Sequence, residues 1–251
     1  MAAFPTAVLA ESPLQRVAAA LIAAYPSAIA RLDGGDLIFK DGRRLPISDG
    51  NDAKSPAARL ENASILDMFA DPYPLSTSSS TAKADADPGR ARNIALFDTL
   101  YGDCKKGETQ RDLVDVVWLP DKSGVKVKMT RRNGAADRLA AVSRELNALP
   151  ARFTTYLVPL GGTFNCRVIA GTSRASTHGY GIAIDIALRH ARYWRWGPTG
   201  KSDPAAYRNA IPQEIVLIFE KHGFIWGGRW AHFDTMHFEY RPEIIAFTRA
   251  K

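Results

Sequence analysis

Two short segments of this 251-residue chain carry histidines and carboxylates at spacings that suit metal chemistry. The first is Ser176-Thr-His-Gly-Tyr-Gly-Ile-Ala-Ile-Asp185, in which His178 precedes Asp185 by seven residues. If its second half is a strand, alternation places Asp185 on the same face as Gly181 and Ala183, which are too small to crowd it. A carboxylate buried on so apolar a strand needs a compensating cation, which is either a metal ion or the partner in a core salt bridge.

The second segment is His232-Phe-Asp-Thr-Met-His-Phe-Glu-Tyr240. Strand alternation puts His237 and Glu239 on one face, and Asp234 precedes His237 by three residues. Two imidazoles and one carboxylate would form a three-ligand zinc site with an open fourth position, as in catalytic zinc centres, and Asp234 or Glu239 would remain as a base. Spacing alone leaves open that each histidine is an ordinary core residue.

Other chemistries find little support in the sequence. The chain lacks the phosphate loop G-x-x-x-x-G-K-[ST] and the hydrolase elbow G-x-S-x-G, and Ile184 occupies the last small position of a dinucleotide fingerprint that would begin at Gly179. A non-haem iron centre with two histidines and one carboxylate is an alternative use of the same residue types. The two cysteines, Cys104 and Cys166, are too few for a clustered zinc site and permit either one disulfide or two free thiols.

The two segments together resemble the VanY-type D-alanyl-D-alanine carboxypeptidase family of zinc peptidases. Ser176-x-His178-x-x-Gly181-x-Ala183-x-Asp185 matches the family signature S-x-H-x-x-G-x-A-x-D in every position. Trp226-Gly-Gly-Arg-Trp230, followed by Asp234-x-x-His237-Phe-Glu239, is similar to the second motif. The resemblance spans about residues 167–240 and says little about residues before about 100. It implies a Hedgehog/D,D-peptidase fold and one Zn²⁺ per chain, bound by His178, Asp185 and His237.

The resemblance also implies catalytic roles. The acidic residue three before the last histidine is the family's general base, usually Glu, and Asp234 stands there, as Asp does in some members such as phage endopeptidases. Glu239 is the alternative base, although we expect it to steady His237 instead. The family arginine that faces the substrate carbonyl falls best on Arg167, with Arg174 as the competitor.

Four further side chains are candidates for supporting the site. Ser176 is expected either to hydrogen-bond within the site or to cap a turn. Tyr180, Trp226 and Trp230 are expected to form cleft walls or to belong to the ordinary core.

The function that the resemblance implies is zinc-dependent cleavage of bacterial peptidoglycan stem peptides, most directly by a D-alanyl-D-alanine carboxypeptidase. An endopeptidase of the L-Ala-D-Glu type and a non-catalytic zinc-containing cell-wall-binding protein remain alternatives. The formal net charge is +7, and residues 165–251 carry 12 Lys+Arg against 7 Asp+Glu. This surplus suits the carboxylates of stem peptides, but it could equally be a solubilising surface. We expect no nucleic-acid partner, because no recognisable motif accompanies the charge, and we expect a monomer.

The elements that must position these residues can be read from periodicity and turn signals. An amphipathic helix is expected near residues 16–24, and Asp41-Gly42 predicts a hairpin between residues 36–40 and 43–47. The other predicted elements are a hairpin of Val116–Leu119 with Val125–Thr130, helices at Ala135–Leu149 and Ile211–His222, and strands at Gly181–Ile186 and Met236–Tyr240. The pattern predicts an α+β fold with helices packed on a small antiparallel sheet.

The chain divides by composition into two parts. Residues 1–90 form an N-terminal extension of unknown role that ends in a Ser/Ala/Asp-rich loop, and residues 91–251 form the zinc peptidase domain, with its motif core at 165–240. The longest apolar run, Val17–Tyr25, is far shorter than the roughly 20 residues of a membrane span. Residues 16–30 imitate a signal peptide but fit a folded helix better, so we expect a periplasmic or extracellular protein whose signal is already removed. In that compartment Cys104 and Cys166 would pair.

Overall fold

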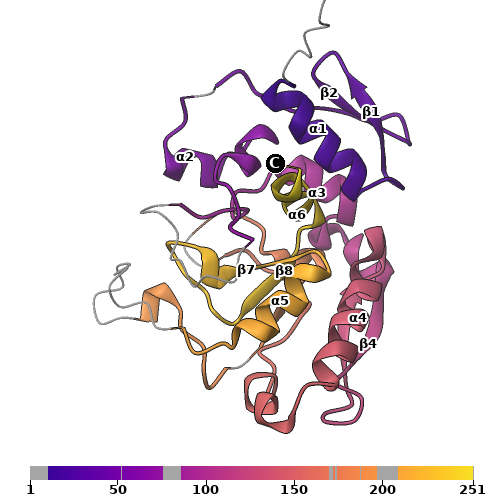
Figure 1. The fold of residues 1–251 in the computed structure, drawn as a ribbon. Coiled ribbons are helices and arrows are strands. Elements are labelled where there is room, and N and C mark those ends of the chain that lie inside the picture. The colour runs from indigo at the N-terminus through magenta and orange to yellow at the C-terminus, as the bar shows by residue number, and fades with distance from the viewer. Residues whose placement is uncertain are drawn as a thin grey trace, which may run out of the picture.

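The structure is a computed structural model that describes residues 11–51, 53–75, 86–169, 172, 174–186, 188–196 and 209–250. Small antiparallel sheets lie among packed helices, as the α+β prediction requires (Figure 1). The expected Ser/Ala/Asp-rich loop falls largely outside the described residues. Within the described ranges, no helix has both the length and the apolar character needed to cross a bilayer.

The N-terminal part begins with helix α1, Pro13–Ala24, and this confirms the predicted helix. A capping box starts it: Ser12 Oγ accepts a hydrogen bond from the N–H of Gln15, and the Gln15 side chain accepts one from the N–H of Ser12. Val17 and Leu21 are buried on one face of the helix. The helix is therefore held by its apolar stripe as well as by its cap.

A three-stranded antiparallel sheet follows, with the order β1-β2-β3. Its strands are β1 (Ile29–Asp33), β2 (Asp36–Phe39) and β3 (Arg44–Pro46). The β2–β3 pair is the hairpin predicted around Asp41-Gly42, where Gly42 adopts a φ of +88°. Strand β1, which the sequence analysis does not predict, pairs with the other edge of β2.

The middle of the chain contains a hairpin and a helix that were both predicted. Strands β4 (Leu113–Trp118) and β5 (Val125–Thr130) pair along their whole length, and α4 (Ala135–Asn147) packs against β4. Two helices before the hairpin, α2 (Pro56–Glu61) and α3 (Ile94–Tyr101), were not predicted.

The C-terminal part is a second three-stranded antiparallel sheet with the order β6-β8-β7. Strands β6 (Ala183–Asp185) and β8 (His237–Tyr240) are the two predicted strands in slightly shorter form, and β7 (Phe224–Trp226) is an additional strand. Helix α5 (Gln213–Lys221) lies within the predicted helix, and α6 (Pro242–Arg249) ends the described chain. Strand β8 therefore lies between the two other strands.

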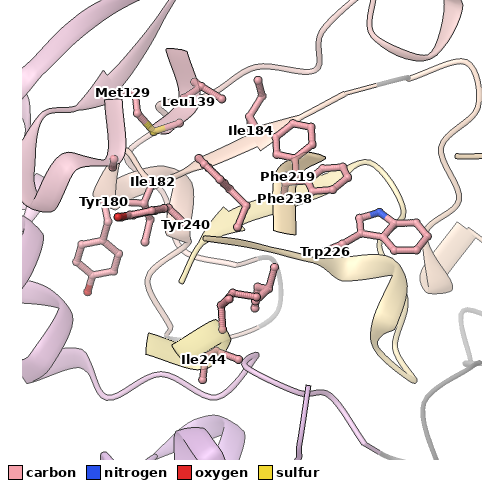
Figure 2. Packing of buried hydrophobic residues seen from close by; sticks show 14 of the residues in the cluster. Met129, Leu139, Tyr180, Ile182, Ile184, Phe219, Trp226, Phe238, Tyr240 and Ile244 are labelled. Atoms are coloured by element: carbon pink, nitrogen blue, oxygen red, sulfur yellow. The ribbon is translucent and has the colours of Figure 1, made fainter. Parts of the chain in front are cut away.

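The hydrophobic core lies against this sheet (Figure 2). Ile182, Ile184 and Ile186 are all fully buried, as the predicted alternation requires. The ring of Phe238 stacks on that of Phe219 from α5 at a centroid distance of 3.9 Å. Burial of each such side chain contributes roughly 1.5–3 kcal/mol, so the core holds the strand pair in place beneath the site.

The N-terminal extension packs against the C-terminal helices. Helix α1 contacts α6 (Figure 1), and the Tyr25 hydroxyl donates a hydrogen bond of 2.5 Å to Glu243. Tyr73 donates one of 2.7 Å to Glu220 of α5. The proposed boundary at residue 90 stays a prediction, and one hydrophobic core includes buried side chains from both sides of it.

Candidate metal centre

His178 is oriented by a tight turn. It lies in the 3-10 turn Thr177–Tyr180, where Ser176 caps the start by accepting a hydrogen bond from the N–H of His178. Gly181 ends the turn with a φ of +65°, and a Cβ there would meet the side chain of Leu113 at 2.8 Å. The Nδ1–H of His178 donates to the carbonyl oxygen of Thr163. That bond leaves Nε2 free to face Asp185.

Strand pairing brings Asp185 and His237 together. Asp185 is the last residue of β6 and lies opposite His237, the first residue of β8. Its Oδ1 is 2.9 Å from Nδ1 of His237, and its Oδ2 is 3.2 Å from Nε2 of His178. One ligand atom from each residue lies within 4.8 Å of the other two. Two imidazole nitrogens and one carboxylate oxygen at this spacing fit a zinc ion that keeps a fourth position open.

The buried charges of the cluster shift each other's proton affinity. Burial alone would raise the pKa of Asp185, but its contacts with the two histidines outweigh burial and hold that pKa below its usual range. Burial alone would lower the pKa of His237, but Asp185 and Glu239 raise it to about 10. A metal ion must therefore displace a proton from His237, so metal binding by this set depends on pH.

Glu239 lies behind His237 and is fully buried. Its Oε2 is 3.2 Å from Nε2 of His237 and accepts a hydrogen bond of 2.7 Å from Arg92, while its Oε1 accepts one of 3.0 Å from Arg241. Burial would raise its pKa, but Arg92, His237 and Arg241 hold the pKa of Glu239 well below its usual range. A carboxylate so engaged is better suited to steadying His237 than to accepting a proton from water.

The carboxylate of Asp234 differs from that of Glu239 in its surroundings. Its backbone N–H donates to the carbonyl of Gly227, and a Cβ on Gly227 would come within 2.5 Å of the Asp234 carbonyl oxygen. Its Oδ1 is buried and has no hydrogen-bond partner among the described residues. Burial raises the pKa of Asp234 to about 6, with a smaller contribution from Asp185 that His237 opposes. Such a carboxylate is suited to general acid–base work near neutral pH.

The cluster opens into a cleft of about 260 Å³. Three supporting residues expected from the sequence line it, namely Arg167, Ser176 and Trp230. Arg167 is exposed, and its guanidinium donates a long hydrogen bond of 3.4 Å to the backbone carbonyl of Val168. Its guanidinium can therefore reach a bound molecule.

Several lining residues were missed by the sequence analysis. Arg90 and Arg92 lie far before the motifs, and Tyr193 and Trp196 follow the first motif. The Tyr193-Trp-Arg-Trp196 run could have pointed to an aromatic surface, and Trp196 is 60% exposed. No local spacing marked the two arginines, because only tertiary packing brings them to the cleft.

Three expected residues lie elsewhere. Tyr180 and Trp226 belong to the core and not to the described cleft lining (Figure 2). Tyr180 donates to Asp98, and the indole N–H of Trp226 donates to the backbone of Thr235, so each polar tip finds a partner inside the protein. Arg174 is mostly covered, lies 3.2 Å from Glu61 and is likewise not part of that lining.

A disulfide joins Cys104 and Cys166, one of the two states that the sequence left open. It connects the segment just after α3 to the residue before Arg167. Gly179, next to His178, packs close to Cys104, where an added Cβ would lie 3.2 Å from the sulfur. The disulfide therefore lies directly behind the turn that carries His178.

Comparison with known proteins agrees with the motifs. A family model described as D-alanyl-D-alanine carboxypeptidase matches residues 170–240, a segment that contains all three members of the cluster and Asp234. The family predicted from the two motifs is thereby confirmed over this segment, and the match supports a peptidase as the class of the protein. No curated protein and no solved structure matches the chain.

Proposed function

We propose that this protein is a zinc peptidase that cleaves peptidoglycan stem peptides, most directly as a D-alanyl-D-alanine carboxypeptidase with a Hedgehog/D,D-peptidase fold. The observation that carries the proposal is the convergence of His178, Asp185 and His237 in a cleft that also contains Asp234, whose buried Oδ1 has no hydrogen-bond partner in the described part of the chain. The family match over the same residues supports it.

The residues present fit a zinc ion by their chemistry and spacing. His178 would bind through Nε2, His237 through Nδ1 and Asp185 through its carboxylate, while the Thr163 carbonyl and Glu239 hold the remaining ring nitrogens. A zinc ion held by such a set supplies Lewis acidity and lets water lose a proton near neutral pH.

Residues of the chain itself would then transfer protons and stabilise charge. Asp234 accepts the proton of the attacking water and returns it to the departing amine, a contribution of about 10²–10⁴-fold in general acid–base catalysis. Arg167 faces the substrate carbonyl and stabilises the negative charge that grows on its oxygen. The wall formed by Trp230, over which Arg90 lies at 5.5 Å, helps to exclude water from the reacting bond.

The charge of the cleft supports an anionic peptide as substrate. Arg167 lines it and is exposed, and guanidinium groups bind carboxylates well, whereas the lining residues Arg90 and Arg92 already pair with Asp87 and Glu239. The disulfide supports an oxidising compartment, so we place the protein in the periplasm or outside the cell.

Metal analysis combined with product analysis tests the proposal. Purified protein should contain one zinc per chain and should release terminal D-alanine from muropeptides, as read by mass spectrometry, and chelation should abolish this activity. Cleavage within the stem would identify the L-Ala-D-Glu type endopeptidase instead. Bound zinc without any product would favour the non-catalytic cell-wall-binding protein, and protein that binds no zinc would refute the proposal.

A further inference from the structure

A buried network of charges connects the residues before position 93 to the candidate metal centre. Glu239 and Arg241 are fully buried, and Arg92 is 8% exposed. Arg92 Nη2 donates to Oε2 of Glu239 at 2.7 Å, and Arg241 Nη1 donates to Oε1 at 3.0 Å. Arg241 Nη1 also donates to the carbonyl of Gly89, which lies on the same segment as Arg92. One carboxylate is thus held from both sides by two guanidinium groups.

The held carboxylate also contacts Nε2 of His237 at 3.2 Å. Thr177 Oγ1 approaches the same nitrogen at 3.3 Å, but a hydroxyl rotates freely and can donate or accept. The ionised carboxylate can only accept, so it requires the proton of the imidazole on Nε2. Nδ1 is then the nitrogen left for Asp185 and a metal ion.

We propose that Arg92 is a positioning residue for the metal centre. Together with Arg241 it holds Glu239 in one orientation, and Glu239 in turn sets the tautomer and ring orientation of His237. The proposal rests on the proposed function in taking His178, Asp185 and His237 as metal ligands. It adds that a residue outside the family-matched segment 170–240 completes the site.

The alternative is that Arg92 only neutralises Glu239. Arg241 already supplies one positive charge to that carboxylate, and it is shared with Glu243, whose Oε1 accepts from Arg241 Nε at 2.5 Å. Without Arg92, Glu239 would lose the hydrogen bond on the oxygen that faces His237 and could rotate. Loss of Arg92 would therefore change the orientation of the ligand His237 as well as the charge balance around Glu239.

Metal affinity of the full-length protein tests the proposal without relying on activity. The variants are Arg92→Met, which keeps the length of the side chain but not its charge, and Arg92→Lys, which keeps the charge without the planar fork. The control is Arg174→Met, because Arg174 is similarly covered but contacts Glu61 and not Glu239. Zinc dissociation constants come from competition with a chromophoric chelator, and Co²⁺ substitution reports ligand geometry through its visible spectrum.

Arg92→Met should weaken zinc binding by about 10–100-fold and alter the Co²⁺ spectrum, Arg92→Lys should weaken it less, and Arg174→Met should match the wild type. A merely structural role would lower thermal stability and leave both the spectrum and the dissociation constant unchanged. Wild-type values for a folded Arg92→Met would overturn the proposal. Should that variant not fold, wild-type values for Arg92→Lys would do so. Failure of the wild-type protein itself to bind zinc would overturn the proposed function as well.

Discussion

The carboxyl group of Asp234 lies beside the three candidate metal ligands, and its buried Oδ1 has no hydrogen-bond partner among the described residues. Glu239, only five residues later, is fully buried and bound by two arginines. The two carboxylates therefore differ in proton affinity because the arginines stabilise the charge of Glu239 and lower its pKa, whereas burial outweighs the charges around Asp234 and raises its pKa. This difference assigns the base role to Asp234 in the proposed mechanism.

Replacement of Asp234 tests that assignment. Asp234→Ala should keep its bound zinc, since the three ligands remain, and should lose about 10²–10⁴-fold in kcat. In the wild type, kcat/KM should fall at acidic pH, because burial raises the pKa of Asp234 and the protonated carboxyl group cannot accept a proton. Zinc content and a pH–rate profile measure both effects. Wild-type turnover in the alanine variant would remove Asp234 from the mechanism.

The burial that raises the pKa of Asp234 also predicts that its ionised carboxylate destabilises the folded protein. The pKa of Asp234 is higher in the folded protein, about 6, than its ordinary value of 3.8, so its contribution to stability is greatest below pH 3.8 and is lost as pH rises through 6. Asp234→Asn should therefore stabilise the metal-free protein at pH 7, by up to about 3 kcal/mol, and change it little at pH 4. Urea unfolding at the two pH values measures this. Equal gains at both would show that the carboxylate charge is not the cause.

Strands β6 and β8 are the elements that place two of the candidate ligands opposite each other. A shift of one residue in their register would turn His237 away from Asp185, because neighbouring side chains point to opposite faces. The buried isoleucines of β6 and the stacked Phe238 hold the register from the core side. The alternation that predicts the core face therefore also fixes which residues face the metal centre.

The turn after β7 is the element that places Asp234. A Cβ on Gly227 would come within 2.5 Å of the Asp234 carbonyl oxygen and 3.0 Å of the Trp230 ring. Gly227→Ala should therefore displace Asp234, lower kcat by at least about tenfold and leave zinc content unchanged, since no ligand lies on this turn. Parallel metal analysis and kinetics distinguish displacement of Asp234 from loss of the metal. Loss of zinc together with activity would show that the turn supports the whole centre.

Across the whole molecule, the disulfide and the N-terminal extension connect the site to distant parts of the chain. Cys104 and Cys166 are 62 residues apart in sequence, and their bond closes a loop behind the turn that carries His178. The extension contributes Tyr25 and Tyr73, whose hydroxyls bond to carboxylates of the C-terminal helices. The site is thus supported by residues well outside the two motifs.

Reduction of the disulfide should lower the free energy of unfolding by about 2–4 kcal/mol, because the open chain regains loop entropy when it unfolds. Urea unfolding with and without a reductant measures the change. A variant with both cysteines replaced by serine is the control, since its unfolding should not respond to the reductant. Identical unfolding of the wild type under both conditions would contradict the expectation.

The sequence by itself determined the residue types of the candidate centre, the alternation of the strand that carries Asp185, the helices α1, α4 and α5, and the hairpins β2–β3 and β4–β5, since each depends on spacing within a few residues. The short strands β1 and β7 and the helices α2, α3 and α6 were not predicted, because short elements carry too little periodicity to recognise. Only the tertiary structure decided that β6 and β8 are neighbours, that Glu239 is paired while Oδ1 of Asp234 has no partner within the described ranges, and that Arg90 and Arg92 line the cleft. Those facts depend on contacts between residues up to 147 positions apart, such as Arg92 with Glu239, and packing over that distance leaves no pattern in local spacing.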